Sequence, residues 1–177
     1  MLYTRKGDDG TSGILGTKAR FPKNSPIYEA LGTLDELNSL LGVCRAHFHF
    51  KKGDVDVVNE IKNVQECLFI IQAELAGAPK SVLQKHISGL ERVIEKIETI
   101  SGNPHSFLIP GSTKTSALLD YARSVSRRAE RRVLNAHLVR KVSFPTRAYL
   151  NRLSSLLYAL ARYSAREEGV KELSPSY

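Results

Sequence analysis

The sequence predicts an all-α fold, an antiparallel bundle of five helices, on three observations. First, five segments of roughly twenty residues repeat apolar side chains with the period of an α-helix. Second, glycine, proline or capping side chains separate these segments by short connections, which favours antiparallel neighbours. Third, the 177 residues, 42% of them hydrophobic, show no shift in composition that marks a domain boundary. A single domain with a full core is therefore expected.

The first two helices have clear boundaries. Ser25 as N-cap and Pro26 at the first helical position begin a helix that is expected to run to about Phe48. After a turn at 51–53, Asp54 is expected to cap a second helix that ends at the breaker 77–79. The inward-facing positions expected in these helices are Leu31, Leu34, Leu37, Leu41, Cys44 or Phe48, Val57, Ile61, Val64, Leu68, Ile71 and Leu75.

The later helices follow from the same rules. They are expected over about 80–100, from a cap at Ser112 or Thr113 to about 138, and from Pro145 to about 169. The inward-facing positions expected in them are Leu83, Ile87, Leu90, Ile94, Ile97, Leu118, Tyr121, Ala122, Val125, Ala129, Val133, Tyr149, Leu150, Leu153, Leu156, Leu157, Leu160 and Tyr163.

Residues 1–25 lack a helical period and are rich in glycine, which predicts a long ordered loop. Ordering such a loop costs chain entropy, so packing or a bound ligand must offset it. The single domain is therefore expected to consist of a loop over 1–25, a helical bundle over 26–169 and a tail over 170–177.

Composition limits the setting and the partner. The formal net charge of +8 favours an anionic partner, such as a nucleotide or nucleic acid. No apolar run reaches the length of a membrane span, and the N-terminus has no apolar signal core, so no membrane partner is expected. The expected location is the cytoplasm, or an organellar matrix if a presequence was removed.

Cysteine and histidine give no sign of a metal site. Cys44 and Cys67 lie within apolar helical patterns and are expected to be buried free thiols. The histidines show no ligand spacing with cysteine or acid and are expected to be structural or surface residues. They are His47, His49, His86, His105 and His137.

An arginine stripe in the fourth helix is the strongest functional signal. It comprises Arg123, Arg127, Arg128, Arg131 and Arg132, with Glu130 set inside it. Arginines four residues apart share a helical face and repel one another, so a bound anion is expected to compensate. Because guanidinium groups bind phosphate bidentately, a polyphosphate is the first candidate. A solvated face or a nucleic-acid patch is the alternative, but Glu130 and the lack of interleaved aromatic residues favour a shaped site.

Other segments are suited to phosphate or nucleoside contacts. In the glycine-rich loop, backbone amides and hydroxyls suit an oxyanion, and Asp8 with Asp9 suits Mg²⁺ bound through water, although composition alone slightly favours an exposed tail. Lys23 gains a role only if the loop folds back onto it. Asp35 suits pairing with an arginine and Asn151 suits a ribose or base edge, but each alone is typical of a solvated side chain.

Four segments, in order along nearly the whole chain, resemble the PduO-type ATP:cob(I)alamin adenosyltransferases, also called corrinoid adenosyltransferases. They are 3–11 (YTRKGDDGT), 29–39 (EALGTLDELNS), 107–111 (FLIPG) running on to 122–131 (ARSVSRRAER), and 150–154 (LNRLS). One such segment alone is a weak signal, whereas four in the same order are specific.

This resemblance implies a homotrimer of five-helix bundles with the active site between subunits. It implies transfer of the 5′-deoxyadenosyl group of ATP to cob(I)alamin, with cobalt(I) as the nucleophile at C5′ and triphosphate as the leaving group. It also implies Mg²⁺ on the ATP phosphates without a direct protein ligand, a reductase for cob(II)alamin, and no nucleic-acid partner.

The resemblance also assigns residues. Phe107 would take the lower axial side of cobalt and displace the dimethylbenzimidazole ligand, and Asp35 would pair with Arg123 across the subunit interface beside the corrin. Arg127 completes the catalytic set. The ATP-binding residues implied are Thr4, Arg5, Lys6, Gly7, Thr11, Ser12, Lys23, Arg127, Arg128, Glu130, Arg131 and Asn151.

The chain departs from the family pattern at a few positions. Asp120 stands where the family often has histidine, and Ser112 replaces a frequent glycine. These changes are expected to alter local hydrogen bonding and corrin fit more than the reaction. The variant stretch Ser12-Gly13-Ile14 leaves open which of Thr11, Ser12 and Gly13 contacts ATP.

Two other functions remain as alternatives. One is a non-catalytic basic helical module that binds nucleic acid or another polyanion. The other is an ATP-binding regulatory protein that kept the fold and lost the corrin site. Phe107 and the pair of Asp35 with Arg123 argue against the regulatory protein, because an ATP sensor needs neither.

Overall fold

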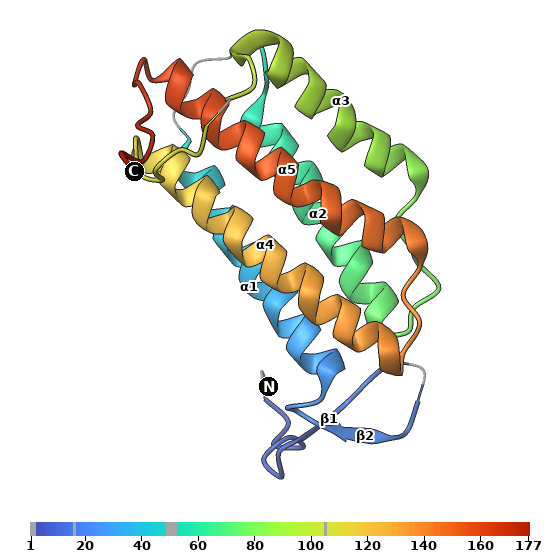
Figure 1. Ribbon diagram of the computed structural model, residues 1–177. Helices are drawn as coiled ribbons and strands as arrows, with labels where there is room; N and C mark the ends of the chain where they lie inside the picture. The colour runs from blue at the N-terminus through green and yellow to red at the C-terminus, as the bar shows by residue number, and fades with distance from the viewer. Residues whose placement is uncertain (1–2, 16, 49–52, 105) are drawn as a thin grey trace.

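The computed structural model describes residues 3–15, 17–48, 53–104 and 106–177, and helices dominate the described chain (Figure 1). The described residues form the five helices α1 (Pro26–His47), α2 (Val57–Leu75), α3 (Gln84–Ser101), α4 (Lys114–Val139) and α5 (Phe144–Glu167). Each helix runs opposite to the one before it along the chain (Figure 1). The expected all-α bundle of five helices is therefore confirmed.

Helix α4 occupies the middle of the bundle. The most extensive contacts join α4 to α1 and to α5, while α3 packs on α5 and α2 packs on α1. Leucine side chains from different helices fill the core, and Leu34, Leu68 and Leu157 are fully buried. Because α4 has α1 on one side and α5 on the other, its polar residues can contact groups on both of these helices.

Helix α2 begins later than expected. Its N-cap is Asp56 rather than Asp54, and the Asp56 carboxylate accepts a hydrogen bond from the backbone amide three residues on, at 3.1 Å. Val55 is buried, and its amide donates to the Tyr163 hydroxyl at 3.1 Å, which keeps the chain extended past Asp54. The expected turn at 51–53 falls partly outside the described residues.

Helix α3 also begins later, at Gln84 instead of about Lys80. Val82 is fully buried and anchors an extended entry into the helix. The His86 ring then accepts a hydrogen bond from the Leu83 amide at 3.1 Å and so caps the first turn. As a result, the Leu83 side chain is 51% exposed and the expectation that it faces inward is wrong.

Residues 11–22 contain a short antiparallel sheet where a continuous loop was expected. Its strands are β1 (Thr11–Gly13) and β2 (Arg20–Pro22), with Ser12 opposite Phe21. Strands of three residues offer too few positions to show a two-residue alternation in the sequence. The hairpin packs on the bundle through Ile14, which is 7% exposed, and through Phe21.

The inward face of α4 differs from the expected one at two large residues. Tyr121 is 55% exposed, whereas Leu119, which was not expected to face inward, is fully buried. The buried stripe runs from Leu119 through Ala122 to Val125, and Tyr121 precedes Ala122 by one residue, which turns it about 100° away. The aromatic ring is therefore on the surface of the single chain.

The cysteine expectation is confirmed. Cys44 and Cys67 are buried free thiols on α1 and α2. Burial raises the pKa of the Cys44 thiol to about 11. His49 and His105 lie outside the described residues.

Candidate functional site

The arginine stripe of α4 divides between two neighbouring helices. Toward α1, Arg128 forms an ion pair with Glu36, and Arg132 lies 3.6 Å from a carboxylate oxygen of Glu29. Arg132, to which the sequence assigned no role, thus has an acidic partner. These acids on α1 offset part of the like-charge repulsion within the stripe.

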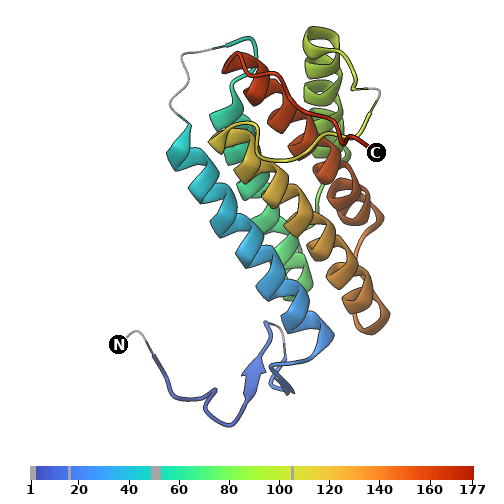
Figure 2. The ribbon, with the colours of Figure 1, turned by 60° about the vertical axis from the view of Figure 1, so that its left-hand side comes forward.

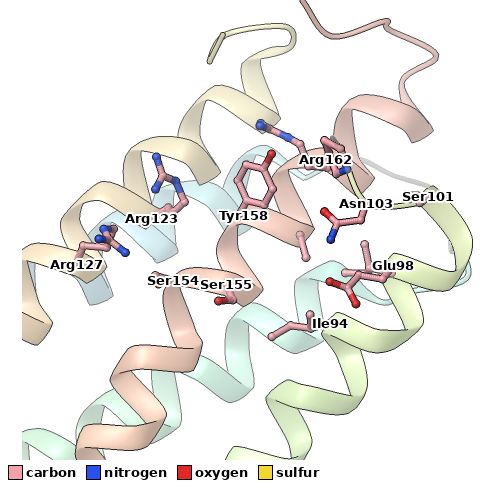
Figure 3. A pocket seen from close by; sticks show the side chains of 14 residues that line it. Ile94, Glu98, Ser101, Asn103, Arg123, Arg127, Ser154, Ser155, Tyr158 and Arg162 are labelled. Carbon is pink, nitrogen blue, oxygen red and sulfur yellow. The ribbon is translucent and has the colours of Figure 1, made fainter. Parts of the chain in front are cut away.

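Toward α5, Arg123 and Arg127 face a cavity of about 310 Å³. Figure 3 shows their side chains on α4, with Tyr158 of α5 and Asn103, just after the end of α3, around the same space. The Nε atom of Arg123 is buried and has no hydrogen-bond partner among the described residues. Two guanidinium groups face this cavity, one of them with an unused donor, and such an arrangement is suited to an anion.

A second cavity, of about 470 Å³, lies beside Phe107. The Phe107 ring is 80% exposed and stands at its edge in the connection between α3 and α4. Arg123, Tyr158 and Arg162 line both this cavity and the one beside Arg127, so the two cavities adjoin. The structure therefore places an aromatic wall next to a cationic pocket within one chain.

Buried charges form the floor of the Phe107 cavity. An Nη atom of Arg162 lies 2.5 Å from a carboxylate oxygen of Asp120, and Arg162 Nε lies 3.0 Å from Glu172. The Arg162 guanidinium also stacks over the Tyr158 ring, 4.8 Å from its centre. Burial raises the pKa of Glu172; Arg162 opposes this shift and Asp120 adds to it. Asp120, a departure from the family pattern, is thus an ion-pair partner.

The sequence interpretation missed Arg162 and Glu172. Arg162 is only 6% exposed because it lies inside the apolar stripe of α5, between Leu160 and Tyr163. A buried arginine requires an acidic partner, so the position of Arg162 in the apolar stripe could have indicated a buried ion pair. The identity of Glu172 as that partner depends on how the chain folds back after α5, and no local pattern predicts that path.

Glu130 and Asn151 come together between α4 and α5. The Asn151 side-chain amide donates to a Glu130 carboxylate oxygen at 3.0 Å and its oxygen accepts from Arg152 at 2.9 Å. Arg152 is itself 3.2 Å from Glu91 of α3. Asn151 is therefore held in one orientation by neighbours on both sides. Arg131 is exposed and has no ion-pair partner among the described residues.

The N-terminal loop folds back onto Lys23. The Lys23 ammonium donates to the carbonyl oxygen of Gly7 at 2.7 Å, and a Cβ at Gly7 would stand only 3.0 Å from the Lys23 nitrogen. A side chain at position 7 would therefore push the flexible end of Lys23 away from the Gly7 carbonyl. The contact places a cation beside the backbone of the loop.

Arg20, which the sequence interpretation did not single out, forms hydrogen bonds across the same loop. Its guanidinium donates to the Thr11 hydroxyl at 2.7 Å, to the Thr11 carbonyl at 3.0 Å and to the Lys6 carbonyl. Asp9 accepts from the Thr11 hydroxyl at 2.7 Å, and this hydrogen bond is the main cause of the lowered pKa of Asp9. Recognising Arg20 requires the register of the hairpin, in which Arg20 stands opposite Gly13.

One chain does not bring the loop to the arginine stripe. In Figure 2 the segment 3–10 leads away from the helices. Thr4, Arg5 and Lys6 belong to this segment. Among the described residues, no hydrogen bond or ion pair joins this segment or Ser12 of β1 to α4. Within a single chain, the expected nucleotide-binding residues are therefore in two separate places.

Asp35 and Arg123 also lie apart within one chain. Asp35 lines a surface groove between α1 and α2 with Tyr28 and the exposed ring of Phe69, whereas Arg123 faces α5. Neither side chain has an ion-pair partner among the residues that the structure describes. A pair between them would require a second copy of the chain.

Acidic, cysteine and histidine side chains do not gather into a metal cage in the described part of the chain, where no group of three or more lies within reach of one ion. In the same part of the chain, none of the helices has the length and apolar character needed to cross a membrane.

Comparison with known proteins identifies the family. The profile of the cobalamin adenosyltransferase family matches residues 2–164. The corrinoid adenosyltransferase PduO of Salmonella typhimurium is 38% identical over 168 residues, which cover 91% of this chain and 48% of that protein. The chain thus spans about half the length of this relative. The corrinoid adenosyltransferase of Bacillus subtilis is 33% identical, with 97% of this chain and 90% of that protein covered.

A solved structure extends the likeness to three dimensions. It is a variant of the PduO-type ATP:corrinoid adenosyltransferase from Lactobacillus reuteri, complexed with cobalamin and ATP. Its TM-score is 0.91 at 27% sequence identity, and the match covers 100% of both chains. With the family profile matched over most of its length, the chain belongs to the cobalamin adenosyltransferase family.

Proposed function

We propose that this protein transfers the 5′-deoxyadenosyl group of ATP to a reduced corrinoid, giving adenosylcobalamin and triphosphate. The observation that carries the proposal is the position of Arg123, which lines both the cationic pocket beside Arg127 and the cavity beside Phe107. A group that passes from one ligand to another needs two adjoining sites, and Arg123 stands at their junction.

The corrinoid substrate itself provides the nucleophile. Cobalt(I) donates its electron pair to C5′ of ATP, the C5′–O bond breaks, and that bond's electron pair leaves on the triphosphate oxygen. Cobalt is thereby formally oxidised to cobalt(III). The protein's task is to align the reactants and to stabilise the growing charge on the leaving group. Arg127 and Arg131 are exposed cations of α4 that suit this role.

Phe107 would serve the reduction that precedes transfer. Its ring is exposed at the edge of the cavity, so it can face the lower side of a corrin placed there. An apolar ring at this position keeps water and the dimethylbenzimidazole base off cobalt, which makes cobalt(II) easier to reduce. A reductase then supplies the electron.

The active site is proposed to form between subunits of a homotrimer. The nucleotide loop leads away from its own helices, and Asp35 and Arg123 lie on different faces of one chain. A second copy would supply the loop residues Thr4, Arg5 and Lys6 to the arginine stripe.

Magnesium is proposed to enter with ATP. The described residues offer no cage of three acidic, cysteine or histidine side chains, and Asp9 is already hydrogen-bonded to Thr11. Asp8 is exposed and could contact a hydrated ion. When bound, Mg²⁺ would supply charge neutralisation on the triphosphate, beside the cations of α4.

A spectroscopic assay tests the function directly. The protein is mixed with ATP, Mg²⁺ and chemically reduced cobalamin, and the absorption spectrum of adenosylcobalamin is expected to appear. Samples without ATP or without protein serve as controls. Folded protein that binds ATP but gives no adenosylcobalamin would contradict the proposal.

Two features of the site count against a general polyanion-binding module. Arg128 and Arg132 have acidic partners on α1, so the stripe is not an open basic face. The cavity beside the exposed Phe107 ring would have no use in such a module. Filter binding is expected to detect no affinity for DNA or RNA at physiological salt, where phosphate-driven binding would be measurable.

A further inference from the structure

The C-terminal segment 170–177 lies along the connection that carries Phe107 (Figures 1 and 2). The Ile109 amide donates to the Leu173 carbonyl at 2.7 Å, and the hydroxyls of Ser106 and Ser174 are 2.9 Å apart. These contacts fall on either side of Phe107 in the sequence. The chain end therefore holds the backbone on both sides of the aromatic residue.

The Phe107 side chain cannot hold itself in place by packing. Its ring is 80% exposed, and Ile109 beside it is 47% exposed. The connection between α3 and α4 also contains Gly111 with a φ of 110°, a conformation that favours glycine and adds no side-chain contacts. The position of the ring consequently depends on what fixes the backbone around it.

The C-terminal segment is anchored to the bundle through one half-buried side chain. The Glu172 side chain is 14% exposed, and its carboxylate forms an ion pair with Arg162, 3.0 Å from Nε, without the geometry of a hydrogen bond. Arg162 is fixed in turn by Asp120, at 2.5 Å, and by the ring of Tyr158. Glu172 is the member of this cluster that comes from the tail, so its bond to Arg162 joins the tail to α4 and α5.

We propose that Glu172 is a positioning residue, which docks residues 170–177 on Arg162 and thereby fixes Phe107 at the wall of the corrinoid cavity. This role rests on the proposed function of that cavity. Glu172 acts through Arg162 and the tail backbone and need not touch the corrinoid.

Two measurements test the role of Glu172: hydrogen exchange of the ligand-free protein, and the signal of four-coordinate cob(II)alamin in the presence of ATP. Glu172→Ala removes the carboxylate that pairs with Arg162, and the Ile109 amide is expected to exchange about tenfold faster or more. In the same variant the four-coordinate cob(II)alamin signal with ATP should fall severalfold, and the KM for corrinoid should rise while the KM for ATP stays unchanged. Glu172→Gln retains an acceptor oxygen and is expected to restore all three.

Glu167→Ala is the matched control, because Glu167 is an exposed acid near the end of α5 without a hydrogen-bond partner among the described residues. It should match the wild type in exchange and in the cob(II)alamin signal. If Glu172→Ala also matches the wild type, Glu172 has no positioning role, even where adenosyl transfer is intact. A change in the KM for ATP equal to that for corrinoid would likewise overturn it.

Failure of the proposed function would give a different result from failure of the positioning role of Glu172. A wild-type protein that forms no adenosylcobalamin from chemically reduced cobalamin would overturn the function and, with it, the role of Glu172 toward a corrinoid. Exchange at Ile109 is measured without ligand and would still show whether the tail contact exists. The two failures are thus distinguishable.

Discussion

The Phe107 end of the bundle and its hairpin end hold their polar groups in different ways. At the Phe107 end, Asp120 and Arg162 are buried and paired beneath a cavity that one chain encloses. At the hairpin end, Arg20 and Thr11 pair within the loop and stay largely exposed, and the segment before them leads away from the helices.

This difference indicates two kinds of site. A cavity built on buried ion pairs is preorganised, so its ligand meets a fixed wall at little further cost in ordering. In the proposed active site, ATP and a second copy of the chain would instead bring the hairpin end to Arg127. Changes near Phe107 should therefore act on corrinoid steps, and changes at the hairpin on ATP steps.

The largest effect is expected in the cationic pocket of α4. Arg127→Ala should lower the rate of adenosylcobalamin formation by roughly a hundredfold, because a charge-stabilising donor to the leaving group is lost. The measurement is the initial rate with chemically reduced cobalamin at saturating ATP. Chromatography should show an unchanged oligomer, since Arg127 is exposed and makes no ion pair within the described chain.

Arg132→Ala is the matched control for this variant. Arg132 is five residues further along α4 and pairs with Glu29 of α1, so its loss should leave the rate within about twofold of the wild type. Equal losses in the two variants would show that general positive charge, and not a shaped site, supports the reaction. A fully active Arg127→Ala protein would remove Arg127 from the site.

Phe107→Ala should separate reduction from transfer. With the ring gone, cob(II)alamin is expected to keep its lower ligand, and turnover from that form should fall about tenfold or more, equivalent to roughly 1.4 kcal/mol of barrier. Turnover from chemically prepared cob(I)alamin should fall much less. Electron paramagnetic resonance reports the coordination of cobalt(II).

Two results would contradict the role of Phe107. One is an unchanged four-coordinate signal in the Phe107→Ala variant. The other is an equal loss in Phe144→Ala, which removes a ring that is 71% exposed at the opposite end of α4 and α5. Thermal stability should hardly change in either variant because neither ring is buried.

Asn151→Ala should weaken ATP binding without affecting the corrinoid. The Asn151 amide is oriented by Glu130 and Arg152, and loss of a hydrogen bond that it makes to the nucleotide should raise the KM for ATP about three- to tenfold. Steady-state kinetics at saturating corrinoid measures the effect. Asn135→Ala, at an exposed position of α4, is the control, and a KM change of the same size there would argue against a specific contact.

Arg20→Met should have a smaller effect at the hairpin end. It removes three hydrogen bonds that fix Thr11 and Lys6 but leaves the strands, so the affinity for ATP should fall roughly threefold. Isothermal titration with ATP measures this change. Lys18→Met removes an exposed cation of the same hairpin, and a similar loss in that variant would attribute the effect to charge alone.

The sequence predicted the parts of this protein that depend on local patterns. Apolar periodicity fixes the inward face of a helix such as α5, where Leu153 and Leu157 are fully buried as expected. Asp54 and Tyr121 were misassigned because tertiary contacts, such as the bond from Val55 to Tyr163, decide where a helix starts and which residue is covered.

The roles of the candidate site residues came from the resemblance, and periodicity alone would not have chosen Phe107 among the aromatic residues. The pair of Arg162 with Glu172 could not be predicted because the two side chains meet only after the chain turns back beyond α5. The hydrogen bond from Arg20 to Thr11 likewise depends on the register of the two strands, which the sequence does not show. Long-range polar contacts of this kind leave no periodic signal.

The smallest effect expected is an opposite response of the two ends to acid. Hydrogen bonds from Thr11 lower the pKa of Asp9, so the stabilisation of the loop turn is present above the unfolded pKa and is lost as pH falls through the folded value. Burial raises the pKa of Glu172, so the tail contact is most favourable below the unfolded pKa and weakens as pH rises through the folded value.

Hydrogen exchange, corrected for the intrinsic rate at each pH, can follow both ends in one experiment. Protection of the Thr11 amide, which donates to Asp9 at 2.9 Å, should fall below about pH 4. Protection of the Ile109 amide should instead fall as the pH rises through the raised pKa of Glu172. Glu172→Gln should abolish the pH dependence at Ile109 alone, and Asp9→Asn that at Thr11 alone. A common response of both amides would mean that the two ends open together, and the contrast between a preorganised corrinoid side and an assembled nucleotide side would then fail.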